Sequence, residues 1–207
     1  MLNFAINVAR DAGGILVDKL GRALQVSNKG AIDLVTEADL ASEKLIIERI
    51  RSHYPRHAIL AEESGASDNT GTSATEWKWI IDPLDGTTNY AHGYPCFCVS
   101  FGVERAGKLE LGVVYDPMRN EMFAAERGQG ATLNERPMRV STVAELSGAM
   151  LCTGFPYDVR ERPDFARDFS NFTMQSQAVR RDGSAALDLA YVACGRFDGF
   201  WEDGLNP

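Results

Sequence analysis

The hydrophobic positions at the start of the chain recur at the spacing of amphipathic helices. Over residues 2–20 they follow one helical face, formed by Leu2, Ala5, Ile6, Ala9, Ala12, Leu16 and Leu20. Thr36-Glu37-Ala38-Asp39 has the form of a capping box, in which the first and fourth residues bond each other's backbone N–H groups. The box opens a second predicted helix that runs through Ile50, and Pro55 closes this region.

The pattern then changes to short apolar segments that are typical of strands. Residues 58–61 and 77–81 are apolar, and each segment is followed by acidic residues. Two antiparallel pairs are predicted further on, 96–103 with 109–115 and 122–125 with 131–133. The remaining elements are strands at 149–153 and 197–201, helices at 162–174 and 184–194, and a polar loop over 64–76. Helices, a mainly antiparallel sheet and a mixed part, in this order, predict a layered α+β fold.

Composition and charge argue against several classes of function. The 207 residues are 44% hydrophobic and 24% charged, which is typical of a globular protein. The net charge of −8 argues against direct nucleic-acid binding and against an anionic membrane, because both require a basic surface. No apolar run approaches a membrane span, and no secretory signal precedes the first helix. The four cysteines fit no zinc spacing, so we expect reduced, mostly buried thiols in a cytoplasmic protein.

Candidate chemistry gathers at two acidic turns. Glu62-Glu63 follows the segment 58–61, and Asp82-Pro83-Leu84-Asp85 follows the segment 77–81, with Pro83 expected to turn the chain. Acids at the exits of buried strands are costly unless cations pair with them. Carboxylates converging from two strand ends suit Mg²⁺, which in turn recruits phosphate oxygens. Gly86-Thr87-Thr88 can present backbone N–H groups and hydroxyls to such an anion.

Five segments of the sequence resemble the inositol monophosphatase family, especially its bacterial branch. They occur in the family's order and spacing over essentially the whole chain, and the third is highly specific. The segments are Asp33-Leu34-Val35-Thr36-Glu37-Ala38-Asp39, Leu60-Ala61-Glu62-Glu63-Ser64, the stretch from Trp79 to Tyr90, the stretch from Arg180 to Leu189, and Gly199-Phe200-Trp201-Glu202.

The resemblance implies roles for individual residues. Glu62, Asp82, Asp85 and the Leu84 carbonyl match the family's Mg²⁺ ligands, and Glu62, Leu84 and Asp85 also match substrate-binding positions. Thr87 matches the residue that orients the attacking water, supported by the acid at Asp39, while Glu63 lies near an additional metal site. Gly86 and Thr87 match positions that hold the phosphate. Positions that line the substrate's ring match Gly183, Ser184, Ala185 and Glu202.

The family's activity and architecture follow as expectations. The resemblance implies Mg²⁺-dependent hydrolysis of a phosphate monoester, inositol 1-phosphate above all, by metal-activated water and without a phosphoenzyme. It also implies lithium sensitivity, a homodimer, and an α/β/α/β/α sandwich of the sugar-phosphatase type. We expect one domain over residues 1–207, with a metal-binding α+β part at 1–140 and an incomplete α/β part at 141–207.

One departure from the family concerns the end of the chain. The family continues directly after the position of Pro207 with a Trp-Asp pair and a small-residue helix, and that aspartate is a further ligand of the second metal. We therefore expect the 207-residue chain to lack its last C-terminal elements, to bind the second metal weakly and to have reduced or no activity.

Several alternatives stay open or are disfavoured at this stage. Fructose bisphosphate, histidinol phosphate or a nucleotide 3′-phosphate could replace inositol phosphate as the substrate. A protein-binding role in a transcription complex, known for some bacterial relatives, is a function of another class. A haloacid dehalogenase-type nucleophile loop is disfavoured because Asp82 and Asp85 are three residues apart rather than two. No serine-hydrolase elbow, Walker loop or Rossmann glycine pattern is present.

Overall fold

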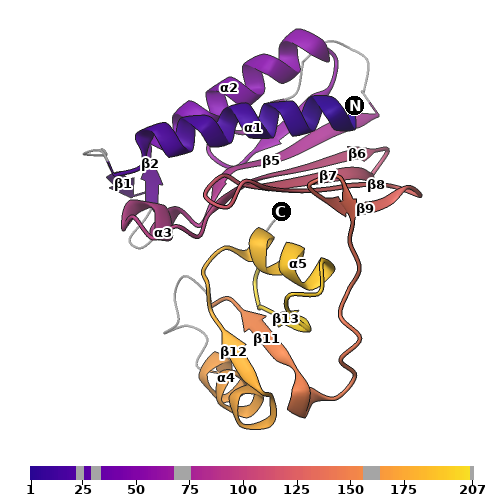
Figure 1. Cartoon of the computed structure of the whole chain (residues 1–207). Coiled ribbons are helices and arrows are strands. Elements are labelled where there is room, and N and C mark those ends of the chain that lie inside the picture. Colours follow the sequence, from indigo (N-terminus) through magenta and orange to yellow (C-terminus); the bar gives the residue numbers. More distant parts are fainter. Residues whose placement is uncertain (22–25, 29–33, 68–75, 156–163, 206–207) are drawn as a thin grey trace.

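The computed structural model describes residues 1–21, 26–28, 34–67, 76–155 and 164–205, and these residues form a sandwich of helical and sheet layers (Figure 1). Helices α1 (Leu2–Lys19) and α2 (Glu37–His53) cover one face of an eight-stranded sheet. Helix α5 (Ala185–Ala193) lies between the other face and a three-stranded sheet, and α4 (Asp164–Gln175) lies beyond that sheet. The predicted α/β/α/β/α layering is confirmed.

The large sheet has the order β10-β9-β8-β7-β6-β5-β3-β4. Its strands are β3 (Ala58–Ala61), β4 (Gly65–Ser67), β5 (Trp77–Asp85), β6 (Cys98–Arg105), β7 (Lys108–Asp116), β8 (Glu121–Glu126), β9 (Gly130–Leu133) and β10 (Arg136–Pro137). All neighbours are antiparallel except β3 and β5, which are parallel. This single parallel pair brings the carboxyl ends of two strands to the same edge, which is what positions the candidate site.

The remaining elements complete the lower layers and the edge of the molecule. The small parallel sheet has the order β12-β11-β13, with β11 at Met150–Thr153, β12 at Ala178–Arg180 and β13 at Gly199–Trp201. Strands β1 (Val26–Asn28) and β2 (Leu34–Thr36) form an antiparallel pair, and α3 (Thr87–Ala91) and a short 3₁₀ turn at Leu146–Gly148 connect other elements. Among the described residues, no helix is both long enough and apolar enough to pass through a membrane.

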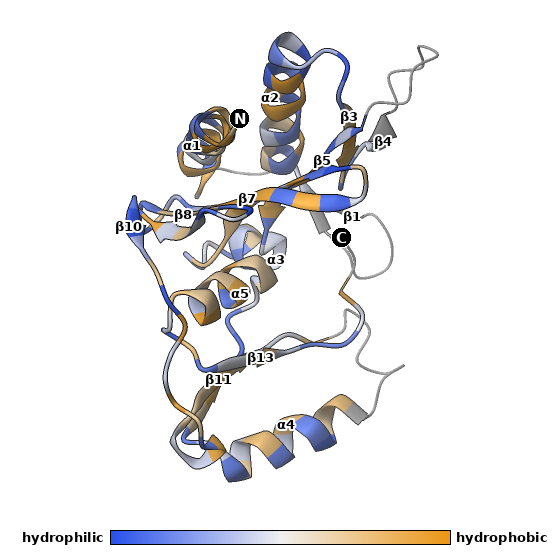
Figure 2. Ribbon diagram, turned by 90° about the vertical axis from the view of Figure 1, so that its right-hand side faces the viewer, coloured by the Kyte–Doolittle hydropathy of each residue, from blue (hydrophilic) through white to orange (hydrophobic). Residues whose placement is uncertain are grey.

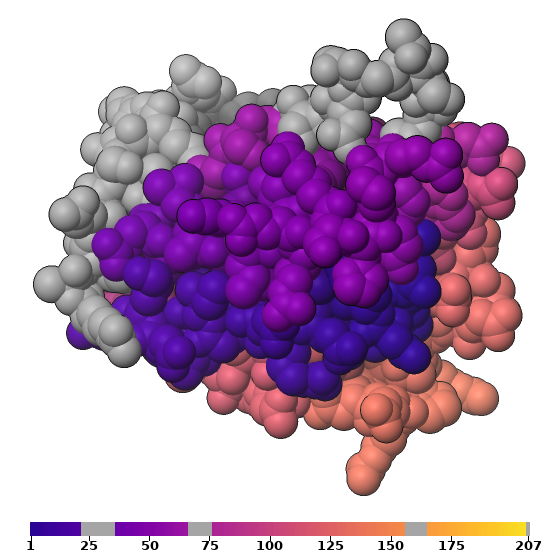
Figure 3. Space-filling model, turned by 90° about the horizontal axis from the view of Figure 1, so that it is seen from above, coloured from indigo at the N-terminus to yellow at the C-terminus, as the bar shows by residue number. Residues whose placement is uncertain are grey.

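Two apolar clusters hold the layers together. The larger cluster joins α1 and α2 to the sheet and includes the fully buried Trp79, Ile46 and Leu16. From above, these two helices form the outer surface over the sheet (Figure 3). The second cluster joins the sheet to α5 through Phe123, Leu187 and other buried side chains. Helix α5 is pale orange along most of its length in Figure 2, as expected for a helix packed between two sheets.

The structure corrects the sequence prediction at Pro83. We expected the chain to turn there, but β5 runs on from Ile81 to Asp85. Its pairing with β6 shifts register between Asp82 and Asp85, so the strand carries a bulge at the proline. A bulge tolerates a residue that has no N–H group to donate to the neighbouring strand. The prediction of a turn is therefore wrong, and Asp82 lies within the strand rather than after it.

Other predicted elements are confirmed with shifted boundaries. The Thr36–Asp39 capping box is present, with α2 starting one residue after Thr36. The first hairpin has a two-residue turn, Ala106-Gly107, with both φ angles positive, in place of the five-residue connection expected. The segment 64–76 contains β4 at its start, and residues 68–75 lie outside the described part. Residues 162–163 of the predicted helix 162–174 also lie outside it. Strand β12 follows no clear sequence signal and was not predicted.

The cysteines confirm the expectation of free thiols. All four are free, with Cys96, Cys98 and Cys152 buried and Cys194 partly exposed. Burial raises the pKa of Cys96 to about 12, so this thiol stays protonated at neutral pH. These side chains therefore behave as small apolar packing groups.

Two adjacent glycines of α1 give a matched test of the packing between helix and sheet. A Cβ on Gly13 would lie 2.6 Å from the Tyr115 ring, whereas a Cβ on Gly14 would meet nothing within 4 Å. We expect Gly13→Ala to lower the free energy of unfolding, because overpacking costs about 1–3 kcal/mol and outweighs the roughly 1 kcal/mol gained in helix propensity. Gly14→Ala should raise it by up to about 1 kcal/mol. Urea unfolding measures both variants, and equal stabilisation by the two would contradict the tight contact.

Candidate active site

The two acidic turns meet at the carboxyl ends of β3 and β5. In the parallel register Ala61 lies opposite Ile81, and the Glu62 N–H group donates to the Ile81 carbonyl at 3.1 Å. The carboxyl groups of Glu62 and Asp82 are close enough to interact, because Glu62 is one of the causes that raise the pKa of Asp82. The predicted convergence of these two segments is therefore present, and it follows directly from the parallel pairing of their strands.

Asp82 interacts with both of the other acids of this group, Asp85 and Glu62. Burial, followed by the negative charges of Asp85 and Glu62, raises the pKa of the Asp82 carboxyl well above its usual range. The Leu84 N–H group donates to Asp82 Oδ1 at 3.0 Å. This hydrogen bond favours the ionised carboxylate and lowers its pKa, but by less than burial and the neighbouring charges raise it. Mutual repulsion of this kind is relieved when a cation binds between the carboxylates.

The donor set fits a divalent cation, although the side chains are not yet arranged around one. Glu62, Asp82 and Asp85 supply hard carboxylate oxygens, the ligands preferred by Mg²⁺. Within the part of the chain that the structure describes, no three His, Cys, Asp or Glu side chains are placed closely enough to form a metal site. The carboxylates are near enough to interact electrostatically.

Thr87 and Asp39 connect the acids to helix α2. The Thr87 hydroxyl donates to the Leu84 carbonyl at 3.0 Å and lies 3.3 Å from Asp39 Oδ1. Asp39 is fully buried and accepts hydrogen bonds from the backbone N–H (2.9 Å) and the hydroxyl of Thr36. Burial outweighs these hydrogen bonds and raises the pKa of Asp39. The capping box that starts α2 therefore also places the carboxylate that faces Thr87.

Gly86 has a conformation and surroundings that only glycine fits. It precedes α3 with φ +94°, in the left-handed region, and a Cβ there would lie 2.9 Å from the Cys96 carbonyl oxygen. Helix α3 is tied in turn to α1, because the Tyr90 hydroxyl donates to the Leu16 carbonyl at 2.7 Å. The backbone of residues 86–88 is thus fixed from two sides, next to the carboxylates.

The second glutamate of the first turn makes a contact that the sequence did not suggest. The backbone N–H group of Glu63 donates at 2.8 Å to Glu43 Oε2, on α2. Glu43 is only 4% exposed. Its position in α2 follows the ordinary helical pattern of that segment, so no local signal marked it as a neighbour of the site.

The lower layers reach the site through the start of α5. Ser184 is fully buried and donates from its hydroxyl to Asp85 Oδ2 at 2.6 Å. Asn89 on α3 donates at 2.7 Å to the carbonyl of Asp182, next to Gly183. Gly183 and Ala185, on either side of Ser184, are partly exposed, with Gly183 at φ +83°. Asn89 and Asp182 had no predicted site role, whereas Asp85, Gly183, Ser184 and Ala185 did.

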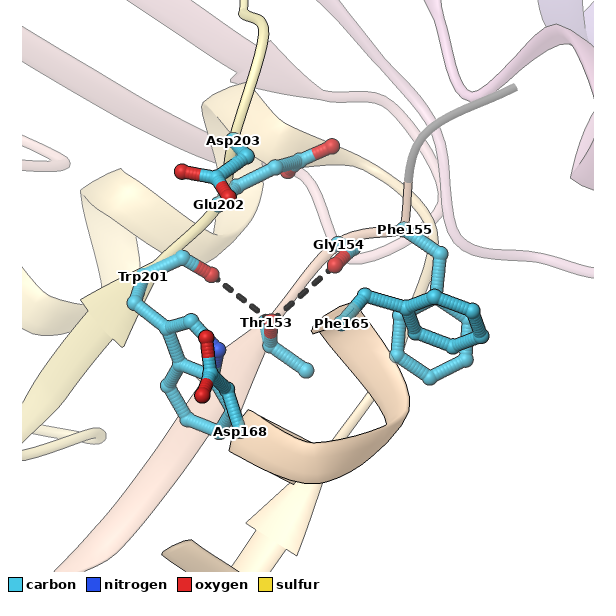
Figure 4. A pocket seen from close by; sticks show the side chains of 8 residues that line it. All are labelled: Thr153, Gly154, Phe155, Phe165, Asp168, Trp201, Glu202 and Asp203. Atoms are coloured by element: carbon cyan, nitrogen blue, oxygen red, sulfur yellow. Dashed lines mark hydrogen bonds between the residues drawn. The ribbon is translucent and has the colours of Figure 1, made fainter. Parts of the chain in front are cut away.

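Glu202 follows β13 and lies against Gly154, which follows the neighbouring strand β11 (Figure 4). A Cβ on Gly154 would overlap the Glu202 carboxylate, so the glycine makes room for this side chain. Glu202 Oε2 is buried and has no hydrogen-bond partner among the described residues. Burial, with the negative charge of Asp85, raises the pKa of Glu202 to about 7. The charge coupling links Glu202 to the carboxylates on the large sheet.

Asp188 is a further buried acid, and the sequence gave it no site role. It lies on α5 with 1% exposure, and burial followed by the charges of Asp182, Asp85 and Glu202 raises its pKa to about 8. In the sequence, Asp188 is a single acid within the apolar repeat of a predicted helix. That pattern predicts a helix but does not mark Asp188 as a residue of the site. The candidate site is therefore more acidic than its sequence motifs alone suggested.

Comparison with known proteins decides the family. The family model described as "Inositol monophosphatase family" matches residues 1–207. The chain belongs to the inositol monophosphatase family. An inositol-1-monophosphatase of Synechocystis is 49% identical over 208 residues, covering 100% of the chain and 71% of the relative. The Nus factor SuhB of Escherichia coli K12 is 47% identical over 213 residues, covering 100% and 78%.

Solved structures of family members share the fold. An inositol monophosphatase from Anabaena superposes with a TM-score of 0.86 at 50% identity, covering 100% of the chain and 75% of that protein. The extragenic suppressor protein SuhB of Bartonella henselae gives a TM-score of 0.93 at 42% identity, covering 99% and 78%. Membership of the inositol monophosphatase family supports a phosphatase activity, in a family that is generally metal-dependent.

Proposed function

We propose that the protein is a Mg²⁺-dependent phosphomonoesterase that hydrolyses inositol 1-phosphate to inositol and phosphate. The observation that carries this proposal is the meeting of Glu62, Asp82 and Asp85 beside the fixed turn at Gly86 and Thr87. The acids supply a divalent-cation site, and the turn supplies backbone N–H groups for an anion. A phosphate ester is the ligand that satisfies both at once.

The chain's own residues have separable tasks in this reaction. Glu62, Asp82, Asp85 and the Leu84 carbonyl would hold the metal, and bound Mg²⁺ neutralises phosphate charge and makes water a better nucleophile. Thr87 has one hydroxyl proton, directed at Leu84 and Asp39, so its lone pairs remain to accept a hydrogen bond from the attacking water and orient it. The N–H groups of residues 86–88 stabilise charge on the phosphate oxygens. Glu63 would assist near a further metal position.

The ring of the substrate would lie between the two sheets. Gly183, Ala185 and Glu202 border the acids from the lower layers, and Glu202 offers a carboxylate that accepts hydrogen bonds from ring hydroxyls. Residues 1–207 would work as one domain, because residues 1–140 hold the metal and residues 141–207 hold the ring. We further propose a homodimer in the cytoplasm and inhibition by Li⁺ in place of one Mg²⁺.

A phosphate-release panel on the complete gene product tests the proposed function. Inositol 1-phosphate, fructose bisphosphate, histidinol phosphate and a nucleotide 3′-phosphate are each assayed with Mg²⁺, with EDTA and with added Li⁺. We expect Mg²⁺-dependent and Li⁺-inhibited release, fastest from inositol 1-phosphate. Release that persists in EDTA, or a phosphorylated Asp82 trapped during turnover, would overturn the mechanism, and a faster competing ester would reassign the substrate.

A second candidate function is a protein-binding role in a transcription complex. It is favoured by the similarity to relatives named Nus factor SuhB, of which those of Pseudomonas aeruginosa and Escherichia coli K12 are 46% and 47% identical to the chain. Pull-down of RNA polymerase components by wild type and by Glu62→Gln separates the two roles. Equal capture by both would support a binding role independent of phosphate chemistry, and absence of capture by wild type would exclude it.

A further inference from the structure

The start of helix α5 is capped by a residue from another layer. Ser184 is the N-cap residue of α5, yet its hydroxyl makes no hydrogen bond to the helix backbone. A serine at this position usually accepts a bond from the second or third N–H group of its own helix. Here the Ala186 N–H group donates to Asp85 Oδ2 at 2.8 Å, across 101 residues of sequence. Asp85 therefore takes the place of the usual cap.

The hydroxyl of Ser184 is turned to the same oxygen. Ser184 Oγ donates to Asp85 Oδ2 at 2.6 Å, and the Cys98 thiol lies 3.8 Å from that oxygen and 3.7 Å from Ser184 Oγ. Ser184 and Cys98 are both fully buried. Asp85 Oδ2 is thus surrounded by the Ala186 N–H group, the Ser184 hydroxyl and the Cys98 thiol. None of these groups is free to rotate into solvent.

These contacts act on the orientation of Asp85. Two short hydrogen bonds, from Ser184 Oγ and from the Ala186 N–H group, converge on the same carboxylate oxygen. Because Oδ2 is held by α5, the direction in which the rest of the carboxylate points is set by the lower layers.

We propose that Ser184 is a positioning residue that holds Asp85 in place and thereby sets the affinity of the site for a divalent cation. This inference rests on the proposed function through the assignment of Asp85 as a metal ligand. The family resemblance implies a different role for Ser184, which is a contact with the substrate's ring. The Ser184 hydroxyl is fully buried and bonded to Asp85, so it faces away from solvent. The small sheet and α5 would then tune the metal site on the large sheet.

Titration with Mg²⁺ alone tests the positioning role. Binding to the complete gene product is measured by calorimetry for wild type, Ser184→Ala, Ser184→Thr and Ser176→Ala, with thermal unfolding of each metal-free protein. Loss of an outer hydrogen bond to a metal ligand costs about 10- to 100-fold in affinity, and we expect a loss in this range for Ser184→Ala. Ser184→Thr keeps the hydroxyl and should restore most of the affinity.

The matched control and the kinetics distinguish positioning from other roles. Ser176→Ala also removes a hydroxyl hydrogen bond, to the Phe172 carbonyl at 2.7 Å, but at a partly buried residue that directly follows α4. Ser176→Ala should bind Mg²⁺ as wild type does. In phosphate release, Ser184→Ala should require more Mg²⁺ for half-saturation, with an unchanged KM for inositol 1-phosphate at saturating Mg²⁺. A raised KM with unchanged Mg²⁺ affinity would overturn the proposal in favour of a ring contact.

The test remains decisive if one variant folds poorly. Ser184→Cys keeps a side chain of similar size with a weaker donor, and we expect an intermediate Mg²⁺ affinity. Wild-type Mg²⁺ affinity in a folded Ser184→Ala or Ser184→Cys protein would overturn the positioning role alone. Weakened Mg²⁺ binding by these variants, together with no phosphate release by wild type on any ester, would support positioning and contradict the proposed function.

Discussion

Asp82→Asn is expected to abolish phosphate release from every ester tested. Asp82 interacts with both Asp85 and Glu62, and in the proposed mechanism its carboxylate is the ligand that both metal positions share. The loss should exceed the about 10- to 100-fold that removal of an outer-shell partner costs. Phosphate release at saturating Mg²⁺ measures the effect, and surviving turnover at a rate near that of wild type would remove Asp82 from the mechanism.

The same variant should be more stable than wild type when no metal is present. Burial and two neighbouring carboxylates raise the pKa of Asp82 in the folded protein, so its ionised form opposes folding at neutral pH. That cost is absent below the usual pKa of an aspartate, where the group is protonated in both states, and it grows as the pH rises through the folded-state value. Thermal unfolding in EDTA between pH 4 and 8 should show a falling stability for wild type and a flatter profile for Asp82→Asn. A variant less stable than wild type at pH 7 would contradict this account.

Gly86→Ala is expected to be the most damaging change outside the carboxylates. The new Cβ would meet the Cys96 carbonyl oxygen at 2.9 Å and the Phe97 Cα at 3.3 Å, and backbone atoms cannot move aside as a side-chain end can. The turn at residues 86–88 should shift, and displaced N–H groups at a charged transition state cost about 10²- to 10³-fold in rate. We expect a loss of kcat/KM of this size.

Gly93→Ala provides the control for the backbone conformation. Gly93 has φ +70°, also in the left-handed region, but a Cβ there would meet nothing within 4 Å. Both variants should lose about 1–2 kcal/mol of stability from the positive φ angle, as urea unfolding measures. Only Gly86→Ala should lose activity, and an equal loss in both would show that the close approach to Cys96 is unimportant.

The elements could be predicted where one local signal dominates. The helical period of residues 2–20 and the Thr36–Asp39 box are local, and α1 and α2 follow them closely. The apolar segments 58–61 and 77–81 are also local, and each is followed by the acids that form the site. These signals depend on spacing over a few residues, which the tertiary structure did not override.

The cross-layer contacts could not be predicted from spacing. The bulge at Pro83 arises from the pairing of β5 with β6, and the bond from Ser184 to Asp85 joins residues 99 positions apart. The sequence placed Ser184 near the site only through the family resemblance, and the resemblance gave it a different role. Likewise, Gly154 matters because Glu202 lies against it, a contact between the ends of two parallel strands.

The metal site itself is tested most directly by a crystal structure grown with Mn²⁺ and inorganic phosphate. Anomalous scattering would locate the cation without reference to the chemistry of turnover. The account predicts anomalous density bounded by Glu62, Asp82 and Asp85, with phosphate against the backbone N–H groups of residues 86–88. Well-ordered carboxylates with no anomalous density between them, and Glu62 turned away from Asp82, would contradict it.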